Sequence, residues 1–394
     1  MFDPESVWEL SGPDRTVFGE GALVELGAHL PPADRTLLVV DPALRGTGIV
    51  EAVEAELPGV ETFEEVEPDP ALATFEAALT RARDLAPDVV AGVGGGSTLD
   101  VAKVTGALAP HDGDVLDYVA EPTGAGRAVP SGSLPTVAAP TTSGTGSETT
   151  PVAVVSLPDR DLKVGVSSDQ LYPDLAVVDP LATVSLPPGP TAASGLDALA
   201  HAVEAYTTRR FDAKGSATPA ERPEYGGRTA LTDALCRVAV PRVGAHLRRA
   251  VDNGDDAEAR REMALTSHVA GRAFSNAGLG AAHAVAMAAG AAFHTPHGET
   301  VGAVLPAVVR YNRPSAPERY ADVARWLGAE GEGAPAAIER LADDVGIGGL
   351  GALGVEEADV PALAERTMEL ERLLVGNPRR LDREDVERIC LDAL

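Results

Sequence analysis

The sequence predicts two domains, an α/β domain built on a parallel sheet and an all-helical domain after it. From Arg35 onward, the first half alternates short apolar runs with longer amphipathic stretches, which is typical of strands joined by helices that cover both faces of a parallel sheet. After Pro187 the strand-like runs nearly vanish and alanine-rich helical patterns dominate. With 394 residues, of which 44% are hydrophobic, the chain can bury a large core. We therefore expect residues 1–187 to form the α/β domain and residues 188–394 the helical domain.

The charge balance excludes two classes of partner. The formal net charge is −28, from 32 basic and 60 acidic residues. Nucleic acid and anionic lipid both require a basic surface, so neither nucleic acid nor a membrane is expected as a partner. The only lysines are Lys103, Lys163 and Lys214. An acid excess with so little lysine fits either a generally acidic proteome or a salt-adapted, halophilic organism.

Cysteine usage and hydropathy predict a soluble cytoplasmic protein. Cys236 and Cys390 are too few and too far apart to form a disulfide framework, so a reducing compartment is expected. No apolar run approaches the roughly 20 residues that span a bilayer. The first residues also lack the pattern of a signal peptide.

Periodicity places the elements of the first half. Strands are expected at residues 36–41, 60–66, 88–94, 161–168 and 175–180, and helices at residues 48–57 and 70–85. Residues 137–150 are expected to begin as another strand and to continue as a loop. Ligands of a parallel sheet bind beyond the carboxyl ends of its strands. The loops that follow the strands are therefore the candidate binding loops.

The first of these loops is the motif V-G-G-G-S-T-L-D-V-A-K. Gly94, Gly95 and Gly96 end a strand, and Ser97 is expected to open a helix, with Asp100 completing a capping box. Glycines leave room for a phosphate, and the start of a helix attracts an anion. A pyrophosphate site is therefore predicted, although a turn needed only for tight strand-to-helix packing remains an alternative. The spacing matches neither the dinucleotide fingerprint nor the P-loop.

A second loop, within V-A-A-P-T-T-S-G-T-G-S-E-T-T, is crowded with hydroxyl groups. Such a loop suits hydrogen bonds to a ribose, an amide or a phosphate, whereas the alternative is a flexible surface loop. Two strands that each feed a glycine-rich loop should place both loops on one edge of the sheet. The candidate binding residues are Thr141, Thr142, Ser143, Thr145 and Ser147.

Asp41, at the end of the first expected strand, is a candidate for ribose recognition. A carboxylate there could bond the ribose hydroxyls of an adenosine. It would repel a 2′-phosphate, so NAD(H) would be preferred over NADP(H).

The second half opens with a possible metal site in S-G-L-D-A-L-A-H-A-V-E-A-Y. Asp197 and His201 stand four residues apart in a helical segment, so both project from one face of the helix. That spacing suits one divalent ion. An exposed pair, or a core histidine bonded to a carboxylate, is the alternative for the pair taken alone.

Two later histidines favour the metal site over these alternatives. His283 lies in an apolar helix, where an unpaired imidazole is unfavourable, and His297 lies between a proline and a glycine. Together with Asp197 and His201, they make a set that suits Fe(II) or Zn(II). His294 is a weaker fifth candidate that could instead pack or cap a helix. No role is assigned to the remaining histidines, His29, His111, His246 and His268.

Several motifs, in order over nearly the whole chain, resemble the iron-containing, group III alcohol dehydrogenase family. They are V-F-G-E-G-A, G-G-G-S-T-L-D, P-T-T-S-G-T-G-S-E, G-L-D-A-L-A-H-A-V-E-A-Y, the G-L-G-A-A-H to T-P-H-G segment, and N-P-R-R-L-D-R-E-D-V. The resemblance implies an N-terminal Rossmann-like domain and a C-terminal helical domain, in the dehydroquinate-synthase-like arrangement. It implies an active site in the cleft between them, with Asp197, His201, His283 and His297 as metal ligands, and a homodimer or larger homo-oligomer.

The activity that follows is hydride transfer between a metal-bound alcohol or carbonyl compound and the nicotinamide of NAD(H). Asp100 and the residues 141–147 would hold the nicotinamide and its ribose, and residues 94–97 the pyrophosphate. The substrate would be a small alcohol or aldehyde. Two alternatives remain: a reductase of an anionic carbonyl compound such as maleylacetate or phosphonoacetaldehyde, with Arg272 as the nearest cation, and a lyase or synthase on the same fold.

Two departures from the family pattern stand out. Many members carry a histidine four residues after the ligand at His283, and this chain has Met287 there. We therefore predict that the proton leaves through the cofactor ribose and water rather than through an imidazole. The segment 209–227 is longer than the corresponding segment of the family usually is, and it is expected to form a surface loop.

Overall fold

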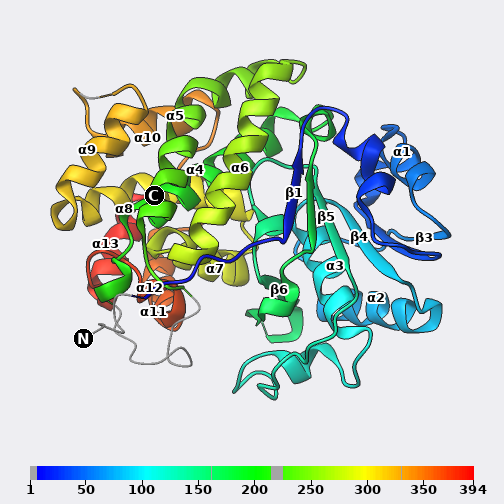
Figure 1. The fold of residues 1–394 in the computed structure, drawn as a ribbon. Coiled ribbons are helices and arrows are strands. Elements are labelled where there is room, and N and C mark those ends of the chain that lie inside the picture. The colour runs from blue at the N-terminus through cyan, green and yellow to red at the C-terminus, as the bar shows by residue number, and fades with distance from the viewer. Residues whose placement is uncertain (1–6, 161, 214–224, 330) are drawn as a thin grey trace, which may run out of the picture. The chain divides into compact units, whose positions relative to one another are not determined.

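The computed structural model describes residues 7–160, 162–213, 225–329 and 331–394. The chain divides into two units: Gly12–Leu186, and Pro187–Leu394 together with the segment that ends at Ser11. Within the described residues, every named strand belongs to the first unit, and the second is built from helices (Figure 1). The predicted fold class is confirmed.

The α/β unit contains a six-stranded parallel sheet with the order β1-β8-β5-β4-β2-β3. Its strands are β1 (Arg15–Phe18), β2 (Thr36–Val40), β3 (Val60–Phe63), β4 (Val89–Gly94), β5 (Thr136–Pro140) and β8 (Leu175–Val178). The four central strands are buried along their whole length. This burial explains why they appear in the sequence as continuous apolar runs.

Helices cover both faces of this sheet. Leu37 and Val39 of β2 pack into one apolar cluster with α2 and α3, and Leu38 and Val40 pack into another with α1. The helices are α1 (Ile49–Glu56), α2 (Leu72–Leu85) and α3 (Gly96–Leu108). Because consecutive strand residues face opposite sides, one short strand contributes to both clusters.

Strands β4 and β5 place the two candidate loops on the same edge of the sheet, as predicted. They pair in parallel, and Gly94 lies opposite Pro140 in the register. The glycine-rich turn and the hydroxyl-rich loop follow directly after these two residues. Their side chains are therefore neighbours within the α/β unit.

The strand predicted at residues 161–168 does not join the parallel sheet. It forms as β7 (Leu162–Ser167) and pairs antiparallel with β6 (Val152–Leu157) in a separate two-stranded sheet. Buried and half-buried residues alternate along β6, which is typical of a sheet with one exposed face. The edge strand β1 is an element that the sequence analysis missed.

The helical unit is built around α4 (Pro188–Thr207), which is buried over most of its length and packs against α5, α6 and α8. Pro188 at its first turn suits a helix start, because a proline there loses no helical hydrogen bond. The other helices are α5 (Ala230–Asp252), α6 (Ala257–Ala277), α7 (Ala281–Phe293), α8 (His297–Asn312), α9 (Pro317–Trp326), α10 (Ala334–Asp344), α11 (Val360–Met368), α12 (Glu371–Leu374) and α13 (Arg383–Asp392). None of the helices in the described ranges is long and apolar enough to cross a membrane.

The segment before Gly12 is bound to the helical unit. The Ser11 backbone N–H donates to Asn276 Oδ1 at 2.7 Å, and Asn276 Nδ2 donates back to the Ser11 carbonyl at 2.9 Å. The Trp8 ring also packs near Phe211, with 6.5 Å between the ring centroids. Residues 214–224, the middle of the predicted surface loop, lie outside the described residues.

Candidate functional site

One buried face of α4 carries three polar side chains. Asp197, His201 and Glu204 stand at positions i, i+4 and i+7, a spacing that aligns them along one side of a helix. All three are buried. The sequence analysis singled out the first two and missed Glu204, although its spacing from Asp197 already placed it on the same face.

The structure brings the four predicted metal ligands near one another, and the ligand atoms of Asp197, His283 and His297 all lie within 4.8 Å of each other. His283 is the third residue of α7, and His297 is the first residue of α8. The Nε2 atoms of His201, His283 and His297 lie 3.7, 3.3 and 3.8 Å from Asp197 Oδ1. The His297 side chain is 36% exposed, whereas the other three are almost fully buried. Three imidazoles thus surround one carboxylate oxygen, and of the four side chains that of His297 is the most exposed.

Glu204 favours one tautomer of the neutral His283 imidazole. Glu204 Oε2 lies 2.6 Å from His283 Nδ1 and also accepts the Gly280 backbone N–H at 2.9 Å. Because the carboxylate accepts here, Nδ1 carries the proton. The lone pair of Nε2 in the neutral ring then points towards Asp197.

That arrangement fits a cation. Among the residues that the structure describes, neither His283 Nε2 nor Asp197 Oδ1 has a hydrogen-bond partner of normal geometry. A nitrogen lone pair and a carboxylate oxygen that face each other in a buried site repel unless a proton or a metal ion lies between them. Nitrogen and oxygen donors in this combination match divalent iron or zinc, so the residues present fit the metal that the sequence implies.

The neighbouring side chains also shift the pKa values of Asp197 and His283. Burial by itself would raise the pKa of Asp197, but the three surrounding histidines lower it well below its usual range. Burial would likewise lower the pKa of His283, but Glu204 and Asp197 outweigh it and raise that pKa to about 9. The pocket therefore favours a positive charge.

Aromatic stacking restrains the histidine rings. The His201 ring stacks on Phe274 with 4.1 Å between centroids and on His283 with 4.5 Å, each at an interplanar angle of 17°. These contacts limit rotation of the rings. His294, by contrast, is exposed and ends α7 in the left-handed backbone region, with φ 54°.

The two loops of the α/β unit contact each other. A Cβ atom on Gly96 would lie only 2.8 Å from Thr145 Cγ2, so the loops can approach this closely only with a glycine there. Thr141 N–H donates to the Gly94 carbonyl at 2.9 Å. Of the predicted binding hydroxyls, Thr142 Oγ1 and Ser143 Oγ have no hydrogen-bond partner within the described part of the chain. Unpaired hydroxyls beside a helix start fit a phosphate.

Asp100 does not cap α3 as predicted. The helix begins at Gly96 with Gly95 as its N-cap and has no side-chain cap, so the predicted capping box is wrong. Asp100 instead accepts hydrogen bonds from Ser147 Oγ at 2.6 Å and from the Val154 backbone N–H at 2.9 Å. These tertiary contacts tie the hydroxyl-rich loop to α3.

Lys103 is a further residue that the sequence analysis missed. Its ammonium group is buried, lies 3.1 Å from Asp100 Oδ1, and donates to the carbonyl oxygens of Ser147 and Val152 at 3.0 and 2.6 Å. Burial lowers the pKa of Lys103, while Asp100 acts in the opposite direction. Its place three residues after Asp100, in a chain with few lysines, was the only available signal.

Asp41 follows β2 and is half-buried, where the sequence predicted it. Its Oδ1 atom accepts the Ala43 backbone N–H at 2.9 Å and so caps a short 3₁₀ turn, Pro42–Leu44. Local capping thus holds the carboxylate at the carboxyl end of the strand.

Comparison with known proteins gives consistent matches over the whole chain. Residues 13–180 match the family described as "Iron-containing alcohol dehydrogenase", and residues 225–394 match "Fe-containing alcohol dehydrogenase family, C-terminal". Long-chain-alcohol dehydrogenase 1 of Geobacillus thermodenitrificans (strain NG80-2) is 39% identical over 400 residues, covering 98% of this chain and 96% of the relative. The NAD-dependent methanol dehydrogenase of Bacillus methanolicus is 34% identical, covering 97% and 98%. The crystal structure of a 1,3-propanediol oxidoreductase superimposes with a TM-score of 0.88 at 32% identity, covering 98% of this chain and 100% of that chain.

Proposed function

This chain belongs to the iron-containing alcohol dehydrogenase family, and we propose that, as an NAD-linked oxidoreductase of alcohols and aldehydes, it works with one divalent ion at Asp197, His201, His283 and His297. The observation that carries the proposal is that Asp197 Oδ1 and His283 Nε2, both buried and without a hydrogen-bond partner of normal geometry among the described residues, face each other 3.3 Å apart. Both Fe(II) and Zn(II) suit this donor set. The family supports iron.

The metal would supply Lewis-acid chemistry, which favours the alkoxide form of an alcohol near neutral pH. The residues of the chain supply the geometry for it. Asp197 contributes the negative charge, and the stacked rings of His201 and His283 hold their nitrogen atoms toward its Oδ1 atom. His297 is the most exposed of the four side chains, so we infer that a substrate would reach the metal beside it.

NAD(H) is the proposed hydride carrier, bound by the loops of the α/β unit. Residues 94–97 would receive the pyrophosphate at the start of α3, and Asp41 would bond the adenosine ribose and exclude a 2′-phosphate. Thr142 and Ser143 offer the unpartnered hydroxyl groups, and Thr141 and Thr145 line the same loop.

Asp100 and Ser147 complete the proposed nicotinamide side of this site. Both Asp100 oxygens already accept hydrogen bonds from the chain. We therefore infer that Asp100 acts through Ser147, by holding the hydroxyl-rich loop in place.

The route of the proton is a separate part of the proposal. Met287 occupies the position where many family members have a histidine, and its half-buried side chain packs against the helical core. A thioether cannot carry a proton at neutral pH. The proton would therefore leave through the cofactor ribose and water.

The small number of lysines argues against a lyase or synthase on the same fold. Such an enzyme would need a cationic phosphate site, but Lys103 is buried and bonded to backbone carbonyls, and Lys163 pairs with Asp69 at 2.8 Å. Lys214 lies outside the described residues. A cytoplasmic location and a homodimer or larger homo-oligomer remain part of the proposal, on the strength of composition and family resemblance.

The function is tested by metal analysis followed by activity assays. The purified chain is stripped of metal, reloaded with Fe(II), Zn(II) or Mn(II), and assayed on a panel of alcohols and aldehydes with NAD(H) and NADP(H), at low and at molar salt. We expect metal-dependent turnover with NAD(H) exceeding that with NADP(H), and retained activity at molar salt if the acidic composition reflects salt adaptation. Absence of turnover with every metal and both cofactors would overturn the proposal.

A further inference from the structure

Glu204 is the only described side chain that caps the start of α7 and also contacts a candidate metal ligand. Its Oε1 atom accepts the Ala282 backbone N–H at 2.8 Å. Its Oε2 atom accepts the Gly280 N–H at 2.9 Å and faces His283 Nδ1 at 2.6 Å. Three donors therefore converge on one buried carboxylate, and both of its oxygens serve as acceptors.

Gly280 permits this approach. A Cβ atom at this position would lie 2.9 Å from Glu204 Oε1 and 3.1 Å from Asn377 Oδ1. The backbone of Gly280 is extended, with φ −150°, so the glycine is needed for space and not for an unusual conformation. Glu204 and Asn377 thus reach the start of α7 from two sides.

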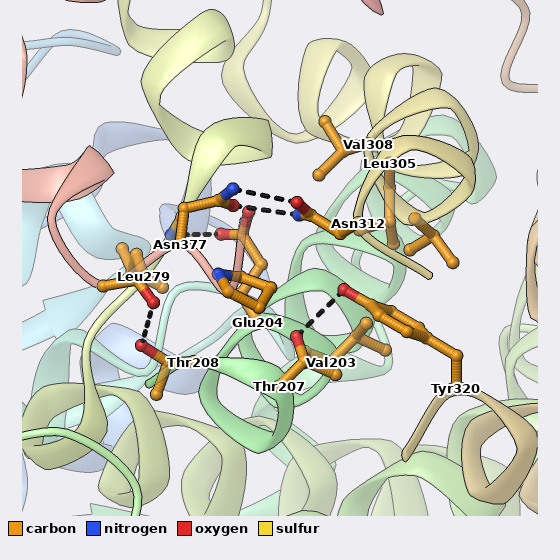
Figure 2. Close-up of a pocket in the computed structure, with 14 residues that line it drawn as sticks. Val203, Glu204, Thr207, Thr208, Leu279, Leu305, Val308, Asn312, Tyr320 and Asn377 are labelled. Atoms are coloured by element: carbon orange, nitrogen blue, oxygen red, sulfur yellow. Dashed lines mark hydrogen bonds between the residues drawn. The ribbon is translucent and has the colours of Figure 1, made fainter. Parts of the chain in front are cut away.

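Asn377 joins this capping arrangement from the carboxyl-terminal part of the chain. Its Oδ1 accepts the Ala281 N–H at 3.4 Å and Asn312 Nδ2 at 2.9 Å, and its Nδ2 donates to Asn312 Oδ1 at 2.9 Å. Figure 2 shows the paired amides beside Glu204, on the wall of a small cavity. Both asparagines are almost completely buried. The N-P-R-R motif, to which the sequence analysis gave no role, therefore begins with a residue that makes a structural contact.

The contacts of Glu204 and Asn377 link the helices that carry the candidate ligands. Glu204 belongs to α4 with Asp197 and His201, Gly280 precedes α7 with His283, and Asn312 ends α8, which begins with His297. Asn377 is anchored in turn, since Thr208 Oγ1 donates to the carbonyl oxygen of Gly376 at 2.7 Å. One buried hydrogen-bonded cluster thus spans all three helices.

We propose that Glu204 is a positioning residue of the metal centre, and that Asn377 and Asn312 hold the helix start on which it acts. Glu204 keeps the proton of His283 on Nδ1, so that Nε2 presents its lone pair, and it fixes where α7 begins. The proposal rests on the proposed function, because it assigns these residues to the metal at that site. A carboxylate behind a ligating histidine is a common means of fixing its orientation.

Replacing the carboxylate by an amide tests this role directly. In Glu204→Gln the side chain keeps its shape, but its NH2 group must face either the Ala282 N–H or the Gly280 N–H and His283 Nδ1. In both orientations a donor meets a donor. We expect the affinity of the full-length chain for Zn(II), measured by chelator competition, to fall by about 10- to 100-fold. The visible spectrum of the Co(II)-loaded variant should shift, because the His283 ligand is misplaced.

Two controls separate positioning from charge and from stability. Glu262→Gln makes the same change in α6, where the partner is Arg242 at 2.8 Å, and should leave the Zn(II) affinity unchanged. Leu341→Ala removes a buried core side chain of α10 and should lower the melting temperature of the metal-free chain without the spectral shift. If Glu204→Gln does not fold, Gly280→Ala tests the same contact, since it displaces the carboxylate without altering any polar group.

The outcomes distinguish this inference from the proposed function. Wild-type chain that binds neither Zn(II) nor Co(II) would overturn both. If the Glu204→Gln variant binds both ions with the affinity and the spectrum of the wild-type chain, the positioning role alone is overturned. The same holds for Gly280→Ala where that variant is used. A weakened Zn(II) affinity with a shifted Co(II) spectrum, absent in both controls, supports it.

Discussion

Asp197 Oδ1 lies 3.3 Å from His283 Nε2, and neither atom has a hydrogen-bond partner of normal geometry among the described residues. Native proteins rarely leave two buried polar atoms in this condition without a reason. Here the two residues come from different helices, α4 and α7, and a second and a third nitrogen, from His201 and His297, converge on the same oxygen. The proposed metal ion would account for all of these contacts.

The first prediction concerns this site. Asp197→Ala and His201→Ala should each abolish metal retention and turnover, because each removes a donor from a four-ligand site. NAD(H) affinity should stay largely intact, since the proposed cofactor residues lie in the α/β unit. Metal content after dialysis and a titration with NADH measure the two properties.

His294→Asn is the matched control for that prediction. His294 lies three residues before His297 but is exposed, and asparagine tolerates its left-handed backbone. The variant should retain its metal, whereas His297→Ala should lose it. Unchanged metal content in Asp197→Ala and His201→Ala would refute the ligand assignment.

The second prediction concerns the cofactor loops. In Gly96→Ala the new methyl group would lie 2.8 Å from Thr145 Cγ2, so one of the two loops must move. Overpacking of this kind costs about 1–3 kcal/mol, and the NADH dissociation constant should rise by about tenfold or more. Metal content should not change.

Gly189→Ala serves as the control for this loop variant. A Cβ atom at Gly189 would have no neighbour within 4 Å, so neither NADH affinity nor metal content should change. A fluorescence titration with NADH measures the affinity of both variants and of the wild type. Equal affinities for Gly96→Ala and wild type would show that the contact between the loops does not shape the cofactor site.

The third prediction concerns Lys103. Lys103→Met keeps the buried aliphatic chain but leaves the Ser147 and Val152 carbonyls, and one side of Asp100, without their cation. Removing one partner of a buried ion pair destabilises a protein by about 3–5 kcal/mol. The urea midpoint for unfolding of the α/β unit should therefore fall markedly, as followed by circular dichroism.

Lys163→Met provides the comparison for that loss. Lys163 pairs with Asp69, whose side chain is 53% exposed, so the pair should contribute no more than about 1 kcal/mol. If both methionine variants unfold at the same urea concentration, the buried network around Lys103 is not important for stability.

The fourth prediction tests the packing of α4. A Cβ atom at Gly195 would overlap the Leu247 side chain of α5, and this helix pair is closely packed. Gly195→Ala should lower the free energy of unfolding by about 1–3 kcal/mol, even though alanine favours the helix by up to about 1 kcal/mol. Gly189→Ala, in the same helix, should be neutral or stabilising; a melting temperature for Gly195→Ala at or above that of wild type would contradict the prediction.

Much of the fold could be predicted because the signal is local. The buried strands β2, β4 and β8 are continuous apolar runs, and the intervening helices have the matching period. Strand β7 was assigned correctly as a strand but to the wrong sheet, because its partner β6 lies on the far side of a turn and pairing depends on register. The capping box failed because α3 begins with Gly95 as its N-cap, which has no side chain to cap with, and Asp100 bonds Ser147 and Val154 instead.

The sequence by itself determined which residue types could hold a metal and which glycines and hydroxyls could receive a phosphate. The helical spacing of Asp197 and His201 is a property of the chain alone. Only the tertiary structure decided that His283 and His297 meet the same oxygen, since they lie on separate helices whose packing depends on many distant side chains. It also decided that Glu204 and Asn377, 173 positions apart in the numbering, reach one helix start, because hydrogen bonds form between groups that are close in space, whatever their separation along the chain.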